Sequence, residues 1–226
     1  MVKRLNKSME LNLEDLKYQH NSAWHGHWRF AEWLVDYLKP SVTVELGVDY
    51  GYSLCCLAKN NPGQVYGIDT FEGDSNAGPR VWEPHYNSLV EKINNHGLTN
   101  ITLIRERFET VAGTWDKIID ILHIDGLHEF EAVNRDLTTW APFVNGNTGV
   151  ILMHDVEAFA DVNTVFKAAP WPKMKFTHSA GLGILTQNTE LLTALRASNL
   201  GNLEEVETTV NPEFVPHGNT PAWVKL

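Results

Sequence analysis

The stretch from Val42 to Ser53 (VTVELGVDYGYS) constrains the fold of this chain more than any other. It begins with a short apolar run rich in β-branched residues, which is typical of a buried parallel strand. The run ends at Gly47, and Gly51 stands just before a segment that has the pattern of a helix start at Tyr52. The stretch therefore predicts a strand, a tight turn and a helix, with backbone N–H groups at the helix start facing a ligand.

The spacing of the two glycines is G-x-x-x-G and differs from the G-x-G-x-x-G of the dinucleotide fingerprint. Glu45 stands two residues before the first glycine. A carboxylate there suits a cofactor with an ammonium group better than one with a pyrophosphate, because like charges repel at short range. S-adenosylmethionine carries such an ammonium group. The alternative is that the glycines serve only the turn.

Further apolar runs alternate with segments of helical periodicity, which predicts an α/β fold. We expect a Rossmann-like, doubly wound, seven-stranded and mostly parallel sheet with a closing antiparallel strand. The segments Lys173–His178 and Gly183–Thr186 are the candidates for the antiparallel part. The expected parallel strands after the first are Gln64–Ile68, Ile101–Ile104, Ile118–Ile124 and Val150–Met153.

The expected domain organisation has three parts. Residues 1–21 form an N-terminal leader, residues 22–188 the cofactor-binding domain, and residues 189–226 a C-terminal helix and irregular tail. Residues 70–88 (TFEGDSNAGPRVWEPHYNS) are expected to be an irregular loop beside the ligand. In the helix expected after Leu127, Asp136 is assigned to the polar face.

Composition excludes several classes of partner. The formal net charge of −10 argues against binding to nucleic acid, which depends on clustered lysine and arginine. No apolar run approaches the roughly 20 residues of a membrane span. The only two cysteines, Cys55 and Cys56, are adjacent and unsuited to a mutual disulfide, which favours a reducing, cytoplasmic location.

Acids and histidines follow the ends of the predicted strands. Asp69 ends the second strand, where Rossmann-like folds hold the adenosine ribose. Asp125 follows the fourth strand, and the pair His154 and Asp155 follows the fifth. Because these ends share one edge of a sheet, Asp125, His154 and Asp155 are candidate ligands of a divalent metal, with Mg²⁺ suggested by the carboxylates. The alternative is that the aspartates cap helices and His154 is a packed neighbour.

His128 stands three residues after Asp125, at the start of the next helix. A histidine titrates near neutral pH and can take the proton of a substrate hydroxyl. We therefore predict that His128 is the catalytic base, assisted by Asp125. The alternative is a surface histidine near a helix start.

The motifs VELGVDYGYS, YGIDTFEGD, IDILHIDGLHEFEAVNRDLTTWAPF and GVILMHD together resemble class I S-adenosylmethionine-dependent methyltransferases, in particular the methyltransferase domain 24 family. The resemblance covers about residues 22–186. It implies that Gly47 and its neighbours Asp49 and Gly51 contact the methionine part of the cofactor, that Ser53 contacts its carboxylate and that Asp69 contacts the ribose. Compared with catechol O-methyltransferase, Asp125, His154 and Asp155 fall on metal-ligand positions and His128 on the catalytic lysine; Asp125 also borders the cofactor.

The resulting hypothesis is a transferase that methylates a hydroxyl of a small molecule or saccharide, with S-adenosylmethionine and a divalent metal. A second copy of the chain is allowed as a partner. Aromatic side chains are expected to stack on a sugar, namely Trp24, Trp28, Phe71 and Trp82. The alternative from another class is a non-catalytic subunit that binds S-adenosylmethionine. Methyl transfer distinguishes an enzyme from a binder.

Overall fold

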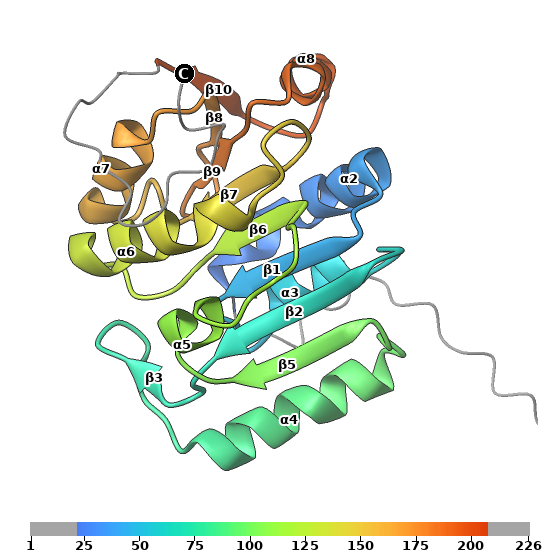
Figure 1. Cartoon of the computed structure of the whole chain (residues 1–226), viewed down its shortest axis with the longest axis vertical. Coiled ribbons are helices and arrows are strands. Elements are labelled where there is room, and N and C mark those ends of the chain that lie inside the picture. The colour runs from blue at the N-terminus through green and yellow to red at the C-terminus, as the bar shows by residue number, and fades with distance from the viewer. Residues whose placement is uncertain (1–21, 208–226) are drawn as a thin grey trace, which may run out of the picture.

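A computed structural model describes residues 22–207 of the protein (Figure 1). An eight-stranded sheet crosses it in the order β10-β8-β9-β7-β6-β1-β2-β5. The strands are β1 (Val42–Leu46), β2 (Gln64–Asp69), β5 (Ile101–Arg105), β6 (Ile121–Ile124), β7 (Val150–His154), β8 (Lys173–Phe176), β9 (Leu182–Leu185) and β10 (Leu203–Val206). A separate short hairpin joins β3 (Gly73–Asp74) to β4 (Gly78–Pro79).

The sheet confirms the predicted α/β class and its mostly parallel character. Strands β7, β6, β1, β2 and β5 pair in parallel, so their carboxyl ends lie along one edge. Strand β9 is antiparallel to both β7 and β8, as was predicted for the segments Lys173–His178 and Gly183–Thr186.

The predicted number of seven strands is wrong, because β10 adds an eighth. It pairs antiparallel with β8, with Glu205 opposite Met174. Its sequence, LEEV, contains two exposed glutamates and too few apolar residues for a strand to be predicted there. An edge strand can tolerate such charges, since only one of its sides is paired.

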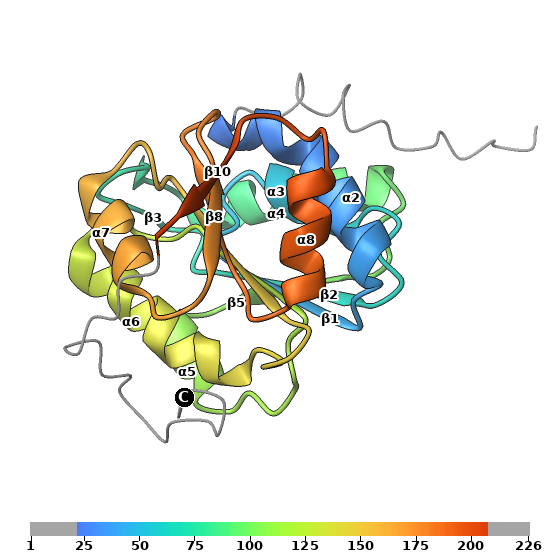
Figure 2. The same cartoon turned by 90° about the horizontal axis from the view of Figure 1, so that it is seen from above.

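The helices form a layer on each face of the sheet, as Figure 2 shows from above. One layer holds α2 (Trp28–Leu38), α3 (Tyr52–Ala58), α4 (Trp82–Asn95) and α8 (Thr189–Ala197), and the other holds α5 (Phe108–Ala112), α6 (Phe130–Trp140) and α7 (Ala160–Ala168). Short 3-10 helices precede α2 (η1, Ala23–His27) and follow α6 (η2, Ala141–Phe143). None of the described helices is long and apolar enough to cross a membrane.

Two segments differ from the expected organisation. Helix α4 begins at Trp82, inside the stretch expected to be irregular, because Pro84 falls in the first helical turn, where a missing N–H does no harm. Helix α8 was placed outside the main domain, yet Leu191 and Leu195 are buried in the same core as α2. The sheet and core thus continue past residue 188 to β10. The expected leader (1–21) and the end of the expected tail (208–226) lie outside the described residues.

Candidate active site

The turn after β1 is held in a conformation that requires glycine. Gly47 has φ +86°, and Gly51, the residue before α3, has φ +76°. A Cβ on Gly47 would lie 2.1 Å from the carbonyl oxygen of Asp125, at the end of β6. The glycines thus allow two strand ends to meet at backbone distance. The predicted strand, turn and helix are all present.

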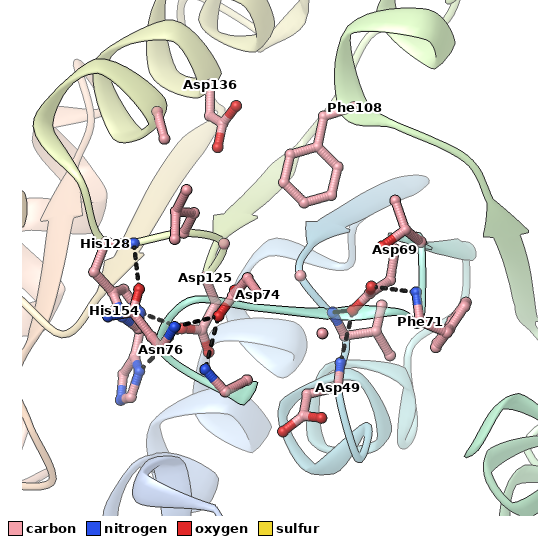
Figure 3. Close-up of a pocket in the computed structure, with 18 of the residues that line it drawn as sticks. Asp49, Asp69, Phe71, Asp74, Asn76, Phe108, Asp125, His128, Asp136 and His154 are labelled. Carbon is pink, nitrogen blue, oxygen red and sulfur yellow. Dashed lines mark hydrogen bonds and ion pairs between the residues drawn. The ribbon is translucent and has the colours of Figure 1, made fainter. Parts of the chain in front are cut away.

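Asp69, at the end of β2, stabilises this turn through hydrogen bonds to its backbone. Its Oδ2 accepts hydrogen bonds from the backbone N–H groups of Val48 (2.8 Å) and Asp49 (3.0 Å), and its Oδ1 accepts one from Phe71 (2.7 Å). A carboxylate has about four acceptor positions, so acceptor capacity remains for a ligand. Figure 3 shows Asp69, Asp49 and Phe71 together on one side of the cleft.

Glu45 lies beneath the cleft and does not line it. Its side chain is fully buried and accepts a hydrogen bond from Ser53 Oγ (2.9 Å), which does line the cleft. His123 Nδ1 lies 3.0 Å from the other oxygen of Glu45, and His123 Nε2 accepts the indole N–H of Trp24 (3.2 Å). Since Nε2 is an acceptor, neutral His123 carries its proton on Nδ1 and donates it to Glu45. Burial raises the pKa of Glu45.

The ends of β6 and β7 bring the predicted metal ligands together. Asp125, His154 and Asp155 each offer one ligand atom, and these atoms lie within 4.8 Å of one another. His154 Nδ1 is 3.3 Å from Asp125 Oδ1 and 3.2 Å from Asp155 Oδ2. His154 Nε2 lies 3.1 Å from the carbonyl of Ser179, which can only accept, so Nε2 is the donor. A neutral His154 therefore directs the lone pair of Nδ1 at the two carboxylates.

This donor set fits a divalent metal. Two carboxylate oxygens and one imidazole nitrogen converge, and the backbone partner of His154 fixes the tautomer that a metal ligand needs.

His128 reaches the same cluster from the loop before α6. Its Nε2 lies 2.8 Å from Asp155 Oδ2 and 4.0 Å from Asp125 Oδ1, and its ring stacks on Phe159 at 4.1 Å between centroids. Its backbone N–H donates to Asn76, in the hairpin between β3 and β4. His128 is thus held between the hairpin, the carboxylates and an aromatic ring. Figure 3 shows His128 beside Asn76 and His154.

The charges of the cluster balance one another. Burial disfavours the charged imidazoles, but the carboxylates of Asp125 and Asp155 raise the pKa of His128 to about 9 and that of His154 to about 10. Burial opposes ionisation of Asp125 as well, but His154 and His128 keep its pKa below the ordinary value. The carboxylates and imidazoles of this cluster thus each favour the charged form of the other.

A cleft of about 940 Å³ connects these groups. Glycine-loop residues, Asp69, Asp125, His128, His154 and Asp155 all line it, and Arg80 pairs with Asp49 at its rim. Of the four aromatic residues expected to stack on a sugar, only Phe71 lines it, and Phe71 is 1% exposed. The prediction for Trp24 is wrong, since this side chain is buried and bonded to His123.

Sequence reasoning missed a second wall of the cleft, formed by Phe108 and the face of α6 that carries Ala132 and Asp136. Asp136 was assigned to the polar face of α6, but it is 3% exposed. The available signal was its spacing of four residues from Ala132, which puts both on one side of a helix, between the apolar stripe and the solvent.

Comparison with known proteins gives a family match. The family described as a methyltransferase domain matches residues 44–156, which is half of the chain. A curated relative, the uncharacterized protein y4gI of Sinorhizobium fredii, is 31% identical over 186 residues. This alignment covers 77% of the chain but only 20% of the relative, so the chain spans about a fifth of that protein's length.

Solved structures of methyltransferases share the fold. The SAH-bound methyltransferase PaMTH1 of Podospora anserina has a TM-score of 0.52 at 11% identity, over 82% of this chain and 98% of that one. The calicheamicin methyltransferase CalS11 has a TM-score of 0.58 at 14% identity, over 82% and 87%. A second structure of CalS11, described as a TDP-rhamnose 3'-O-methyltransferase, has a TM-score of 0.53 at 16% identity, over 71% and 77%.

Proposed function

This chain belongs to the methyltransferase domain family, and from that premise we propose that it transfers the methyl group of S-adenosylmethionine to a hydroxyl of a small molecule or saccharide. One observation carries the proposal: the glycine loop with Asp69 and the histidine His128 line the same cleft. A cofactor site and a proton acceptor thus face a common space, as a two-substrate transfer requires.

The cofactor would lie along the ends of β1 and β2. We assign its methionine part to Gly47, Asp49 and Gly51, its carboxylate to Ser53 and its ribose to the free acceptor capacity of Asp69. Glu45 would act from below, as a buried negative group that favours the ammonium group. Its hydrogen bond to Ser53 also orients that hydroxyl.

The reaction would be a direct displacement. The acceptor oxygen attacks the sulfonium methyl carbon, the bond between carbon and sulfur breaks, and sulfur keeps the electron pair in neutral S-adenosylhomocysteine. The hydroxyl proton passes to His128 in its neutral form, which a divalent ion held by Asp125 and Asp155 would favour, because its charge offsets the carboxylates that raise the pKa of His128 to about 9. Asp155, 2.8 Å from Nε2, orients the ring and stabilises the imidazolium that forms. Asp125 also favours that charge.

Asp125, His154 and Asp155 would hold a divalent ion, for which Mg²⁺ is the first candidate. When bound, it would supply Lewis acidity that lowers the pKa of a nearby acceptor hydroxyl. The carbonyl of Ser179 supports His154 in this role, since it fixes the proton on Nε2.

A saccharide acceptor is supported by the sugar nucleotide named for CalS11 and by the polar side chains of the cleft. The net charge of −10 makes a nucleic-acid acceptor unfavourable. We further propose a cytoplasmic protein, with a homo-oligomer as an allowed assembly, in agreement with the two free, buried cysteines of the described chain.

The cofactor and metal are tested by isothermal titration with S-adenosylhomocysteine, in Mg²⁺ and in a chelator, with NAD as control. We expect binding of S-adenosylhomocysteine and none of NAD, and tighter binding in Mg²⁺. Absence of binding in both conditions would contradict the cofactor assignment. Equal affinity in both would count against a metal that touches the cofactor site.

The base is tested with His128→Ala and radiolabelled S-adenosylmethionine, against a panel of nucleotide sugars and small hydroxylated acceptors. We expect His128→Ala to lose transfer by about 10²-fold or more while its affinity for S-adenosylhomocysteine stays close to wild type. His96→Ala, outside the cleft, is the matched control and should keep full activity. Full transfer by His128→Ala would remove His128 from the mechanism. Cofactor binding without transfer to any acceptor would favour the non-catalytic subunit.

A further inference from the structure

The turn between β8 and β9 has a backbone conformation that its residues disfavour. Ser179 and Ala180, at its centre, have φ of +50° and +66°, and the N–H of Gly181 donates to the carbonyl of His178 at 2.9 Å. Positive φ at both central residues is typical of a type I′ hairpin turn, in which asparagine and glycine predominate. The left-handed conformation is unfavourable for serine and alanine, so contacts with other parts of the chain must maintain this turn.

The segment before α2 supplies such contacts. The backbone N–H of Gly26 donates to Ser179 Oγ at 3.0 Å, and His178 Nε2 lies 3.3 Å from the carbonyl of Gly26. A Cβ on Gly26 would lie 2.1 Å from Ser179 Oγ, so glycine is required for this approach. Residues 24–28 (WHGHW) are thus fastened to the turn through their central glycine.

His27 contacts the same turn and leaves one of its nitrogens unpaired. Burial lowers the pKa of His27 to about 3, so the fully buried ring is neutral and carries one proton. His27 Nε2 lies 3.3 Å from the carbonyl of Ser179, which can only accept, so Nε2 holds that proton. Nδ1 is buried and has no hydrogen-bond partner among residues 22–207. An apolar ring would fill this space without an unpaired acceptor, so packing alone does not account for a histidine here.

The Ser179 carbonyl has a second donor, and this donor is a candidate metal ligand. His154 Nε2 lies 3.1 Å from the same oxygen, while His154 Nδ1 faces Asp125 and Asp155. A carbonyl oxygen has two lone pairs, so His27 and His154 together occupy both. Their rings also meet edge to face, with centroids 5.9 Å apart. The carbonyl therefore links the segment before α2 to the candidate metal ligands at the ends of β6 and β7.

We propose that Ser179 and His27 are positioning residues of the metal site. Ser179 presents its carbonyl to His154 Nε2, so that Nδ1 of the same ring is directed at the two carboxylates. His27 and Gly26 hold that carbonyl in place. Outer partners of this kind orient a metal-binding imidazole and change the affinity for the metal. This inference rests on the proposed function, which assigns a divalent ion to the cluster.

The test measures the affinity of the chelator-treated protein for Mn²⁺ alone, from the electron paramagnetic resonance signal of the free ion. Mn²⁺ accepts the carboxylate ligands that suit Mg²⁺. His27→Phe should lower this affinity by about tenfold or more. Its midpoint of thermal unfolding should not fall, because the Ser179 carbonyl keeps its donor His154 and the unpaired Nδ1 is removed. His27→Gln, whose amide can donate to the carbonyl, should restore the affinity to within about threefold of wild type.

A second pair of variants tests the turn. Ser179→Gly relieves the left-handed backbone but removes the Oγ that accepts the N–H of Gly26, so the affinity for Mn²⁺ should again fall by about tenfold. Ala180→Gly is the matched control. It relieves the neighbouring position in the same way and removes only a methyl group, so it should keep the wild-type affinity.

The outcomes separate the inference from the proposed function. If wild-type protein binds Mn²⁺ and both His27→Phe and Ser179→Gly keep its affinity, the positioning role is overturned and the metal assignment stands. Equal losses in His27→Phe and His27→Gln would also overturn it, because the hydrogen bond would then not be the cause. If wild-type protein binds no Mn²⁺, the inference and the metal assignment both fail. Binding of S-adenosylhomocysteine without metal tests the cofactor assignment separately.

Discussion

At the scale of single residues, two side chains that line the cleft, Asp69 and His154, are held by backbone groups. Asp69 receives three backbone N–H groups, and His154 donates to the carbonyl of Ser179. Backbone partners fix a side chain firmly, because they move only when an element moves. Sequence positions at strand ends predicted Asp69, Asp125, His128, His154 and Asp155 as neighbours of one cleft, and the structure gathers them there. Their chemical roles stay predictions.

Asp136 leads to a prediction about pH. Burial raises its pKa from 3.8 to about 7, against the opposing effect of Arg135. The folded protein thus holds this proton more tightly than the unfolded chain does, so stability falls as the pH rises from about 4 to 7, and the loss is complete above 7. We expect Asp136→Asn to stabilise the ligand-free protein by about 2–4 kcal/mol at pH 8 and by much less at pH 5.

Urea unfolding of the ligand-free protein at pH 5 and pH 8 measures this effect, with Asp116→Asn as the exposed control. If Asp136→Asn raised the free energy of unfolding equally at pH 5 and pH 8, ionisation of Asp136 would not be what destabilises the ligand-free protein.

At the scale of elements, sequence periodicity located the parallel strands because each is a short apolar run followed by a polar residue. The same criterion failed for β10, where LEEV pairs at an edge with two exposed glutamates, and for the first turns of α4, where Pro84 resembled a loop signal. In both cases pairing or packing with distant residues decides the structure, and local composition does not report it. The face of α6 that carries Asp136 is a third example, since Asp136 is 3% exposed although its neighbours in sequence are polar.

Helix α8 gives the prediction at this scale. Leu195 is fully buried against the core that α2 and α3 share, although the sequence suggested a boundary at residue 188. We expect Leu195→Ala to lower the free energy of unfolding of the whole protein by about 2–5 kcal/mol. Thr193→Ala, on the exposed side of the same helix, should change it by less than about 0.5 kcal/mol. Urea unfolding decides; equal effects of the two variants would mean that α8 is not part of the cooperative core.

At the scale of the whole molecule, both helical layers pack on one sheet, and the cleft is lined by residues after β1, β2, β5, β6 and β7. A ligand in the cleft therefore contacts segments from across the sheet. We expect S-adenosylhomocysteine at a hundred times its dissociation constant to stabilise the protein by about 2.7 kcal/mol, in a single unfolding transition shifted by several degrees. Calorimetric scans with S-adenosylhomocysteine and with NAD measure this. Two separate transitions, only one of which responds, would show that the two layers unfold independently.

Gly47 lies so close to the carbonyl of Asp125 that this part of the cleft wall tolerates no substitution. Other parts of the wall can be varied. No side chain fits between these strand ends, so the wall assigned to the cofactor is fixed by the backbone itself. The hairpin from Gly73 to Pro79 also lines the cleft. Its two glycines are fixed as well, because Gly78 has φ +78° and a Cβ on Gly73 would lie 2.0 Å from the carbonyl oxygen of Gly78. To redirect this scaffold to a different acceptor, the positions to vary are the hairpin residues that line the cleft and are not glycine, namely Asp74, Asn76 and Ala77.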